Sequence, residues 1–173
     1  MPVEFPDVGS PDGGNLFIRL KDGESINLIL RGRLHAFKIH WISGRSSLCL
    51  GKKDCEACKS GNKAKFRFNA NVIVKEGENY VVKIWEQGWQ MFEQLREWGK
   101  EMDLEITPIK ITRKGSGQND TTYVPIPLKP ITPAQNDQFR AMKLYDLANL
   151  DQELAATQQP PAAGDFNFED ISF

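Results

Sequence analysis

The sequence predicts a mainly β protein, and two observations support this expectation. Apolar and polar residues alternate with a period of two over long stretches, above all in residues 25–42 and 65–75. Turn-forming residues separate these stretches, and strands do not alternate with helices as they would in a parallel α/β fold. Roughly five or six strands around one inserted helix favour a small closed barrel.

Residues 25–42 form the longest predicted strand. Its inward apolar residues occupy even positions up to Leu34 and odd positions from Phe37 onwards. We interpret this change of phase as a β-bulge near His35 and Ala36, which would bend the strand as a small barrel requires.

The other elements follow from shorter patterns. We expect strands at 16–20, 65–75, 80–85, 104–113 and 122–128, and helices at 88–102 and 133–150. Thr132 is the predicted N-cap of the last helix, with Pro133 in its first turn and Gln135 completing a capping box. Pro125 and Pro127 would confine the last strand to a sheet edge. An OB-fold, a five-stranded barrel, is the leading candidate.

The ends of the chain differ in composition from its middle. Residues 1–14 contain three prolines and no basic segment, so we expect a flexible arm rather than a secretory signal. Residues 15–150 form the predicted domain, and residues 151–173 begin as a flexible linker rich in Gln, Ala and Pro. Since no stretch approaches the roughly 18 apolar residues that cross a bilayer, we expect no membrane association and a cytoplasmic location.

The charge of the chain is unevenly distributed. Residues 147–173 contain five acidic residues and no Lys or Arg, which leaves 22 basic against 18 acidic residues in the rest of the chain. Residues 31–75 hold eleven Lys or Arg against Asp54 and Glu56 alone. A basic middle followed by an acidic end favours a domain that binds a polyanion, although a solvated surface with an unrelated tail is the alternative.

Four residues have the spacing of a metal site. His40, Cys49, Cys55 and Cys58 form the pattern H-x8-C-x5-C-x2-C. One His and three Cys satisfy a tetrahedral structural zinc site that leaves no open position. The segment 40–64 has few apolar residues, so a bound ion would supply the order that packing cannot.

Three alternatives to this zinc site stay open at the level of sequence. Cys55 and Cys58 would also suit a redox dithiol, and the three cysteines could all be unliganded. His35 could replace His40 as the ligand, but it lies on the far side of the predicted bulge.

A surface for single-stranded nucleic acid needs cations for phosphates and flat side chains for bases. The outward-facing candidates are Arg31, Arg33, Lys38, Lys65, Arg67, Asn69, Asn71, Lys75 and Lys83. Among the aromatic residues, Trp85 is the best candidate for stacking, because alternation in 80–85 places it outward. Trp89 and Trp98 lie on the apolar stripe of the predicted helix, which favours a place in the core.

The last nine residues, 165–173, interleave acidic and apolar side chains and end on a phenylalanine. A basic, apolar pocket on a partner could hold the terminal ring and carboxylate, and the same acids could occupy the basic surface when nucleic acid is absent. An end without function is the alternative. The candidate partner-binding residues are Asp165, Phe166, Phe168, Glu169, Asp170, Ile171 and Phe173.

With these motifs, residues 16–147 resemble the zinc-containing single-stranded-DNA-binding proteins of tailed phages. The resemblance rests on the long basic strand, the His and C-x5-C-x2-C pattern, and the strand GNKAKFRFNANV. The terminal segment is separately similar to the Phe-ended tips of bacterial single-stranded-DNA-binding proteins. The spacing between His40 and Cys49 is shorter than in the phage family, and the tail has fewer acids than in many relatives.

The resemblance implies a fold, a set of partners and a role. The expected fold is a mainly β, OB-fold-like small barrel with a zinc insertion at 40–64, one or two helices and a disordered acidic C-terminal tail. It implies sequence-independent binding of single-stranded DNA in replication, recombination and repair. It also implies recruitment of a polymerase, helicase or nuclease by the tail, with Phe173 as the anchor.

We therefore expect a binding protein rather than an enzyme, with structural Zn²⁺ as its cofactor and no small-molecule substrate. The alternatives are a small zinc-dependent phage nuclease and a zinc-stapled protein adaptor. The nuclease is disfavoured because the chain has two histidines, one of which is a predicted ligand, and no paired carboxylates stand out.

Overall fold

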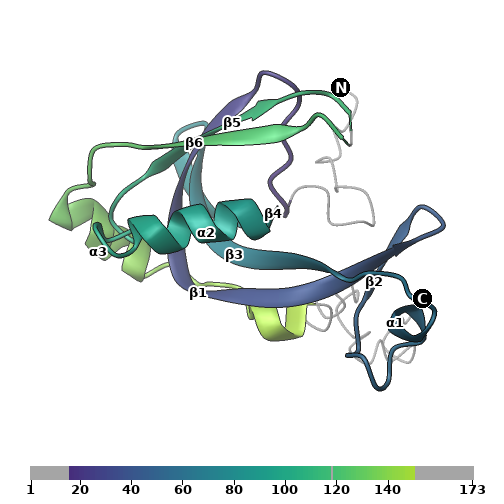
Figure 1. The fold of residues 1–173 in the computed structure, drawn as a ribbon. Helices are drawn as coiled ribbons and strands as arrows, with labels where there is room; N and C mark the ends of the chain where they lie inside the picture. The colour runs from purple at the N-terminus through teal and green to yellow at the C-terminus, as the bar shows by residue number, and fades with distance from the viewer. Residues whose placement is uncertain (1–15, 118, 151–173) are drawn as a thin grey trace, which may run out of the picture.

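The structure, a computed structural model, describes residues 16–117 and 119–150 (Figure 1). The protein is mainly β, as predicted, with six strands in one antiparallel sheet. The strands are β1 (Ser25–Ile42), β2 (Arg45–Leu48), β3 (Lys65–Glu76), β4 (Asn79–Gly88), β5 (Ile109–Lys114) and β6 (Thr122–Pro127). The helices are α1 (Glu56–Lys59), α2 (Trp89–Trp98), α3 (Pro133–Arg140) and the short 3₁₀ turn η1 (Leu147–Asn149).

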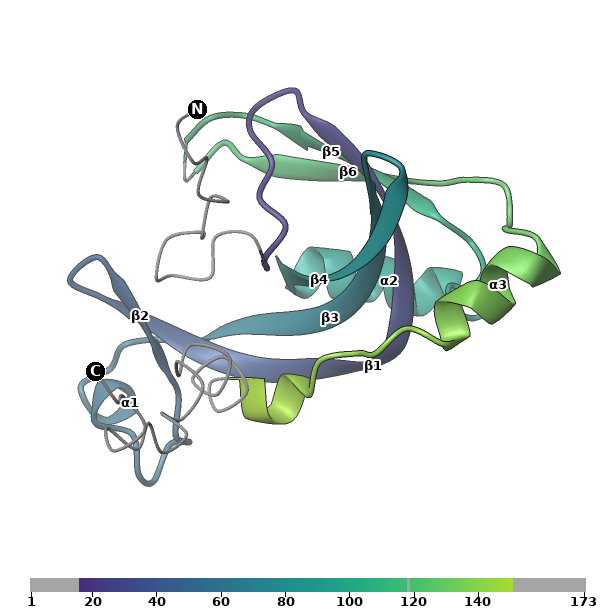
Figure 2. The same ribbon diagram turned by 180° about the vertical axis from the view of Figure 1, so that it is seen from behind.

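The strand order is that of an OB-fold. The sheet runs β4-β3-β1-β5-β6, so the long β1 lies between two antiparallel hairpins, and the short β2 pairs with the end of β1. α2 follows β4 and precedes β5, which is the position of the OB-fold helix. Figures 1 and 2 show α2 between the β5–β6 hairpin and the layer formed by β1 and β3.

The predicted bulge in β1 is present, slightly earlier than expected. Arg31 pairs with Asn71, and the next register pair joins His35 to Asn69, so β1 contains two more residues than β3 in this interval. Gly32 has a φ of 68°, a conformation that favours glycine. A Cβ there would also lie 3.1 Å from Leu144 Cδ1. The bulge therefore occupies 32–34, immediately before the predicted position.

Apolar residues pack on both faces of the sheet. The interior cluster joins residues of β1, β3, β4 and β5 to Met91 and Leu95 of α2. On the outer face, Phe139 of α3 packs against Ile29 and Ile73. Leu147 and Leu150, in and beside η1, pack against Ile84 of β4. The C-terminal elements therefore cover part of the outer face of the barrel.

The last predicted helix is shorter than expected. Its capping box is confirmed, because Thr132 Oγ1 accepts from the Gln135 amide at 3.3 Å, but α3 ends at Arg140. Asn71 of β3 then pairs with both backbone groups of Tyr145, at 2.9 and 3.0 Å. These bonds replace those that a continuing helix would use, so the chain runs along the sheet until η1.

The start of the described chain also differs from the prediction. The strand expected at 16–20 is reduced to an isolated bridge in which Phe17 pairs with Ile84. β5 begins at Ile109 rather than at 104. The predicted arm at 1–14 and the linker and acidic tail at 151–173 lie outside the described residues. Within the described ranges, no helix is long and apolar enough to span a membrane.

Candidate metal centre and nucleic-acid surface

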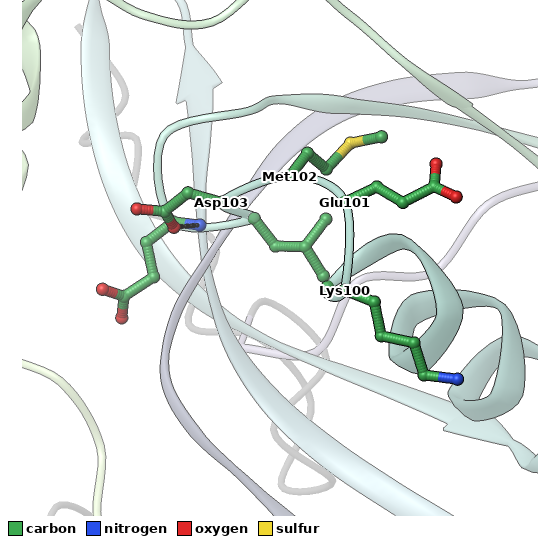
Figure 3. Close-up of a pocket in the computed structure, with 7 residues that line it drawn as sticks. Lys100, Glu101, Met102 and Asp103 are labelled. Carbon is green, nitrogen blue, oxygen red and sulfur yellow. Dashed lines mark hydrogen bonds between the residues drawn. The ribbon is translucent and has the colours of Figure 1, made fainter.

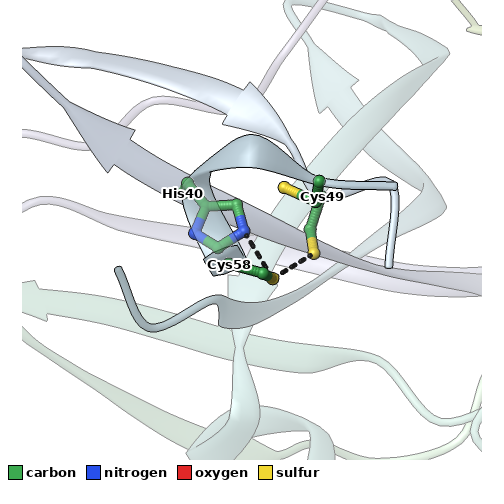
Figure 4. A group of neighbouring side chains, drawn as sticks. His40, Cys49 and Cys58 are labelled. Atoms are coloured by element: carbon green, nitrogen blue, oxygen red, sulfur yellow. Dashed lines mark hydrogen bonds between the residues drawn. The ribbon is translucent and has the colours of Figure 1, made fainter. Parts of the chain in front are cut away.

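The four residues singled out by their spacing come together at one point of the structure. His40 is the antepenultimate residue of β1, Cys49 follows β2, Cys55 caps α1 and Cys58 lies within α1. One ligand atom from each lies within 4.8 Å of those of the other three. Figure 4 shows His40, Cys49 and Cys58 directed toward one another, with the Cys58 sulfur between the other two groups.

The distances within this group suit a tetrahedral metal ion. Cys58 Sγ lies 3.5 Å from Cys49 Sγ and 3.3 Å from His40 Nε2. Ligands at ordinary zinc bond lengths would be separated by about 3.8 Å for two sulfurs and about 3.6 Å for sulfur and nitrogen. A disulfide would bring two sulfurs to about 2.05 Å, and all three cysteines are free. The group can therefore bind a metal ion through four protein ligands.

Asn62 orients the histidine, and the sequence pattern gave no signal for it. Its Oδ1 lies 3.0 Å from His40 Nδ1, and its amide nitrogen donates to the Trp41 carbonyl at 3.3 Å. A proton on Nδ1 shared with Asn62 leaves Nε2, the nitrogen nearest Cys58, free to ligate. The same hydrogen bond raises the pKa of His40.

The cysteines differ in acidity because their surroundings differ. Hydrogen bonds from backbone groups, first that of Cys58, lower the pKa of Cys55 to about 6. A backbone hydrogen bond from Gly51 lowers the pKa of Cys49. Desolvation, together with the neighbouring thiols, raises the pKa of Cys58 to about 11. Ionisation is therefore favoured at Cys55 and Cys49 and opposed at Cys58, and a bound cation would offset the repulsion among three thiolates.

His35 is not part of this group. Its ring stacks on Phe37, with centroids 6.0 Å apart and planes at 20°, on the face of β1 opposite to His40. His40 is fully buried among the cysteines. Of the two histidines, the structure therefore places His40 among the candidate ligands.

The prediction that Trp85 faces outward and stacks on bases is wrong. Trp85 is 2% exposed and packs edge-on against Phe68 inside the barrel. Trp89, expected in the core, is 52% exposed at the start of α2 and rests on Phe66 and Phe92, with centroids 5.1 and 5.7 Å away. Tyr80, Val82 and Ile84 are apolar because they meet the C-terminal elements, so alternation selected the wrong face of β4.

Three of the predicted DNA-binding residues are buried. Arg31 is 5% exposed and donates to the Glu105 carbonyl at 3.0 Å and to Asn136 at 3.1 Å. Asn71 holds Tyr145, and Asn69 is 6% exposed. These side chains do leave the barrel interior, but the outer face is covered there. Arg31 and Asn71 therefore fix the C-terminal elements rather than meet solvent.

The remaining predicted residues differ in exposure and in position along the sheet. Arg33, Lys38, Lys65 and Lys75 are exposed, whereas Arg67 and Lys83 are partly buried in ion pairs with Glu86 and Glu76. Lys75 lies near the turn between β3 and β4, at the opposite end of β3 from Lys65. Lys38, Lys65 and Arg67 lie at the end of the sheet near His40 and the three cysteines, which we call the His/Cys group.

A groove of about 520 Å³ runs beside the His/Cys group. We call it the lysine groove, because Lys38, Lys52 and Lys63 line it together with Cys49 and Cys58. All three lysines are exposed, and none of its lining residues is acidic. The fold of the segment 40–64 thereby brings three lysines that are far apart in sequence to one groove. Such a concave positive surface attracts polyanions.

A second groove measures about 560 Å³. We call it the tryptophan groove; Phe66, Trp89 and Tyr123 line it with Lys65 and Arg67. The first turn of α2 points into this region and carries no acidic residue. Lys38 of the first groove and Phe66 of the second are register partners across β1 and β3, so their side chains share one face. The two grooves therefore adjoin.

A further hollow, of about 510 Å³, follows the loop Gly99–Glu105 after α2 (Figure 3). Its labelled acidic side chains, Glu101 and Asp103, diverge rather than face a common point. Lys100 is engaged with Glu97 at 2.8 Å. This hollow brings no set of converging groups together.

In comparisons with known proteins, no family model, curated protein or solved structure matches the chain.

Proposed function

We propose that the protein binds single-stranded DNA without strong sequence preference and that the His/Cys group holds a structural zinc ion. The observation that carries the proposal is that Lys38 of the lysine groove and Phe66 of the tryptophan groove are cross-strand partners, which places the two grooves next to each other. A single strand requires cations for phosphates next to flat rings for bases. The two grooves supply both on one face.

The mechanism has no chemical step. Phosphates along the lysine groove displace counterions into solution, which contributes a favourable entropy. A base stacks on the exposed face of Trp89, which Phe66 and Phe92 hold in place. Because bases in a duplex are already stacked on one another, the groove favours unpaired strands.

Zinc would act on the shape of the lysine groove. His40 belongs to the sheet, whereas Cys49, Cys55 and Cys58 belong to the inserted loop. Four protein ligands leave no open position for substrate, which supports a structural rather than a hydrolytic role. The ion would therefore fix Lys52 and Lys63 relative to Lys38 on β1.

The wider biological role is also a proposal. The resemblance to the phage proteins supports coating of single strands during replication, recombination and repair. It also supports recruitment of a polymerase, helicase or nuclease by residues 165–173. Three thiols in a metal group favour a reducing compartment such as the cytoplasm of a host cell.

Binding of a labelled oligo-dT, followed by fluorescence anisotropy over a range of salt concentrations, tests the proposal. We expect tight binding in dilute buffer, a steep loss of affinity with salt, and weaker binding of duplex DNA. Replacing Lys38, Lys52 and Lys63 by Gln should reduce the slope of log affinity against log salt by about 2. The matched control replaces Lys110, Lys129 and Lys143, exposed lysines outside both grooves, and should leave the slope near the wild-type value.

Several results would count against this function. A folded, zinc-loaded protein that ignores oligo-dT is not a single-strand-binding protein, and an adaptor would then be the better description. Cleavage of labelled strands in the presence of magnesium would favour the nuclease. An equal loss of slope in both triple variants would show that net charge, rather than the lysine groove, governs binding.

A further inference from the structure

A third groove lies on the other face of β1. It measures about 460 Å³, and we call it the asparagine groove, because Asn69 lines it together with Glu86. Ile39 lines this groove, whereas its neighbour Lys38 lines the lysine groove. Adjacent residues of a strand point to opposite faces, so the two grooves lie on the two sides of β1. The segment 147–150 forms one wall.

The side-chain oxygen of Asn69, a residue that lines this groove, lacks a hydrogen-bond partner. The residue is 6% exposed, and its Oδ1 is buried without a hydrogen-bond partner. Most buried polar atoms have a partner, and leaving one without a donor destabilises the fold. The Asn side chain can turn about its last torsion, which has broad preferences. A ligand that donates a hydrogen bond would satisfy this oxygen.

Glu86 provides a second acceptor next to the first. Asn69 and Glu86 are register partners across β3 and β4, so their side chains are neighbours on one face. Arg67 binds one carboxylate oxygen of Glu86 at 2.9 Å and thereby keeps the carboxylate in position. With the Asn69 amide turned toward the groove, its oxygen and the Glu86 carboxylate would be two adjacent acceptors for a ligand.

The walls of the groove suit a flat molecule. The rings of His35 and Phe37 stack with their planes at 20°, and both line the groove. Leu48 of β2 and Leu147 of η1 add apolar surface. Flat apolar walls around a pair of acceptors are what a nucleobase requires when its edge carries donors.

We propose that the asparagine groove receives a guanine base of the bound single strand. The proposal rests on the proposed function and adds a base preference to it. Guanine carries two adjacent donors on its Watson–Crick edge, the ring N1–H and the 2-amino group. Thymine carries one donor between two carbonyl acceptors, which two protein acceptors would repel. Adenine and cytosine each place an acceptor beside their amino group. Guanine alone thus matches Asn69 and Glu86 together.

The test compares oligonucleotides of equal length on the wild-type protein in lithium buffer, which disfavours four-stranded guanine structures. One contains thymine only, the second has isolated guanines, and the third has inosine at the same places. We expect the guanine oligonucleotide to bind about tenfold more tightly than the thymine one. Inosine lacks the 2-amino group and should fall between them.

A variant locates the preference. Asn69→Leu keeps the branching of the side chain, in a larger volume, but removes the acceptor, so it should bring the guanine and thymine affinities together. Asn79→Leu, at an exposed position of β4 outside the groove, should preserve the difference. Equal affinity of the wild-type protein for all three oligonucleotides would overturn this inference while leaving the proposed function standing. A guanine preference that survives in Asn69→Leu would overturn it as well. Binding of none of them would overturn both.

Discussion

Replacing Trp89 by Ala tests the assignment of the stacking residue. The side chain is 52% exposed, so its buried half removes roughly 100 Å² of apolar surface from water. At about 25 cal/mol per Å², the loss of this packing destabilises the fold by at most about 2.5 kcal/mol. The loss of one base stack should weaken DNA binding by about 1–3 kcal/mol, or roughly 5- to 150-fold in Kd.

Trp41 provides a matched control for this substitution. It is 49% exposed and lines neither the lysine groove nor the tryptophan groove. Trp41→Ala should therefore lower the midpoint of urea unfolding about as much as Trp89→Ala does, while the Kd for oligo-dT stays near the wild-type value. Anisotropy titrations well below the melting temperature measure both Kd values. An unchanged Kd in Trp89→Ala, or an equal weakening in Trp41→Ala, would refute the reasoning.

Three further predictions concern other parts of the molecule. Chelation of the proposed zinc, or Cys58→Ser, should make the thiols reactive to a thiol reagent. It should also lower the salt slope of DNA binding by about 1–2, because the lysine groove loses its shape, and an unaffected slope would contradict this. Asn71→Leu removes both hydrogen bonds to Tyr145 and should cost about 1–3 kcal/mol in urea unfolding, and an unchanged midpoint would show that the C-terminal elements do not depend on it. The pKa of Asp146 is lowered from 3.8, chiefly by a hydrogen bond from Asn149. Its stabilising effect is therefore present above about pH 4 and lost as the pH falls through the lowered pKa. The difference in urea midpoint between wild type and Asp146→Ala should shrink as the pH falls below 3.8, and a constant difference would contradict the linkage.

Local patterns were sufficient to predict the β class and the four residues that the fold brings together as candidate metal ligands. The alternation of residues 25–42 and 65–75 requires only neighbours in sequence, and both segments lie in strands, β1 and β3. The ligand spacing likewise lies within one continuous segment, His40 to Cys58. Asn62, which orients His40, lies four residues beyond this segment and belongs to no spacing pattern.

The exposure of side chains was predicted less well than the strands, because exposure depends on which elements pack against each face. In β4, Val81 and Trp85 face the interior, whereas Val82 and Ile84 face the C-terminal elements, so both faces are apolar. Alternation cannot say which of two apolar faces belongs to the barrel. Asn71 was correctly directed out of the barrel, but its burial depends on Tyr145, which lies far along the chain. Only the fold brings them together.

Strand β1 contributes to three parts of the molecule: the pairing with β5, the bulge, and the group of side chains near its end. Its first residues pair with β5, Gly32 lies in the bulge, and its last residues carry Lys38 and His40. One residue inserted between Gly32 and Lys38 would leave the barrel pairings in place but rotate both side chains to the other face of the strand. The three cysteines would lose His40 as a neighbour, and the lysine groove would lose Lys38. A change of length by one residue in this interval would therefore alter the His/Cys group and the lysine groove together.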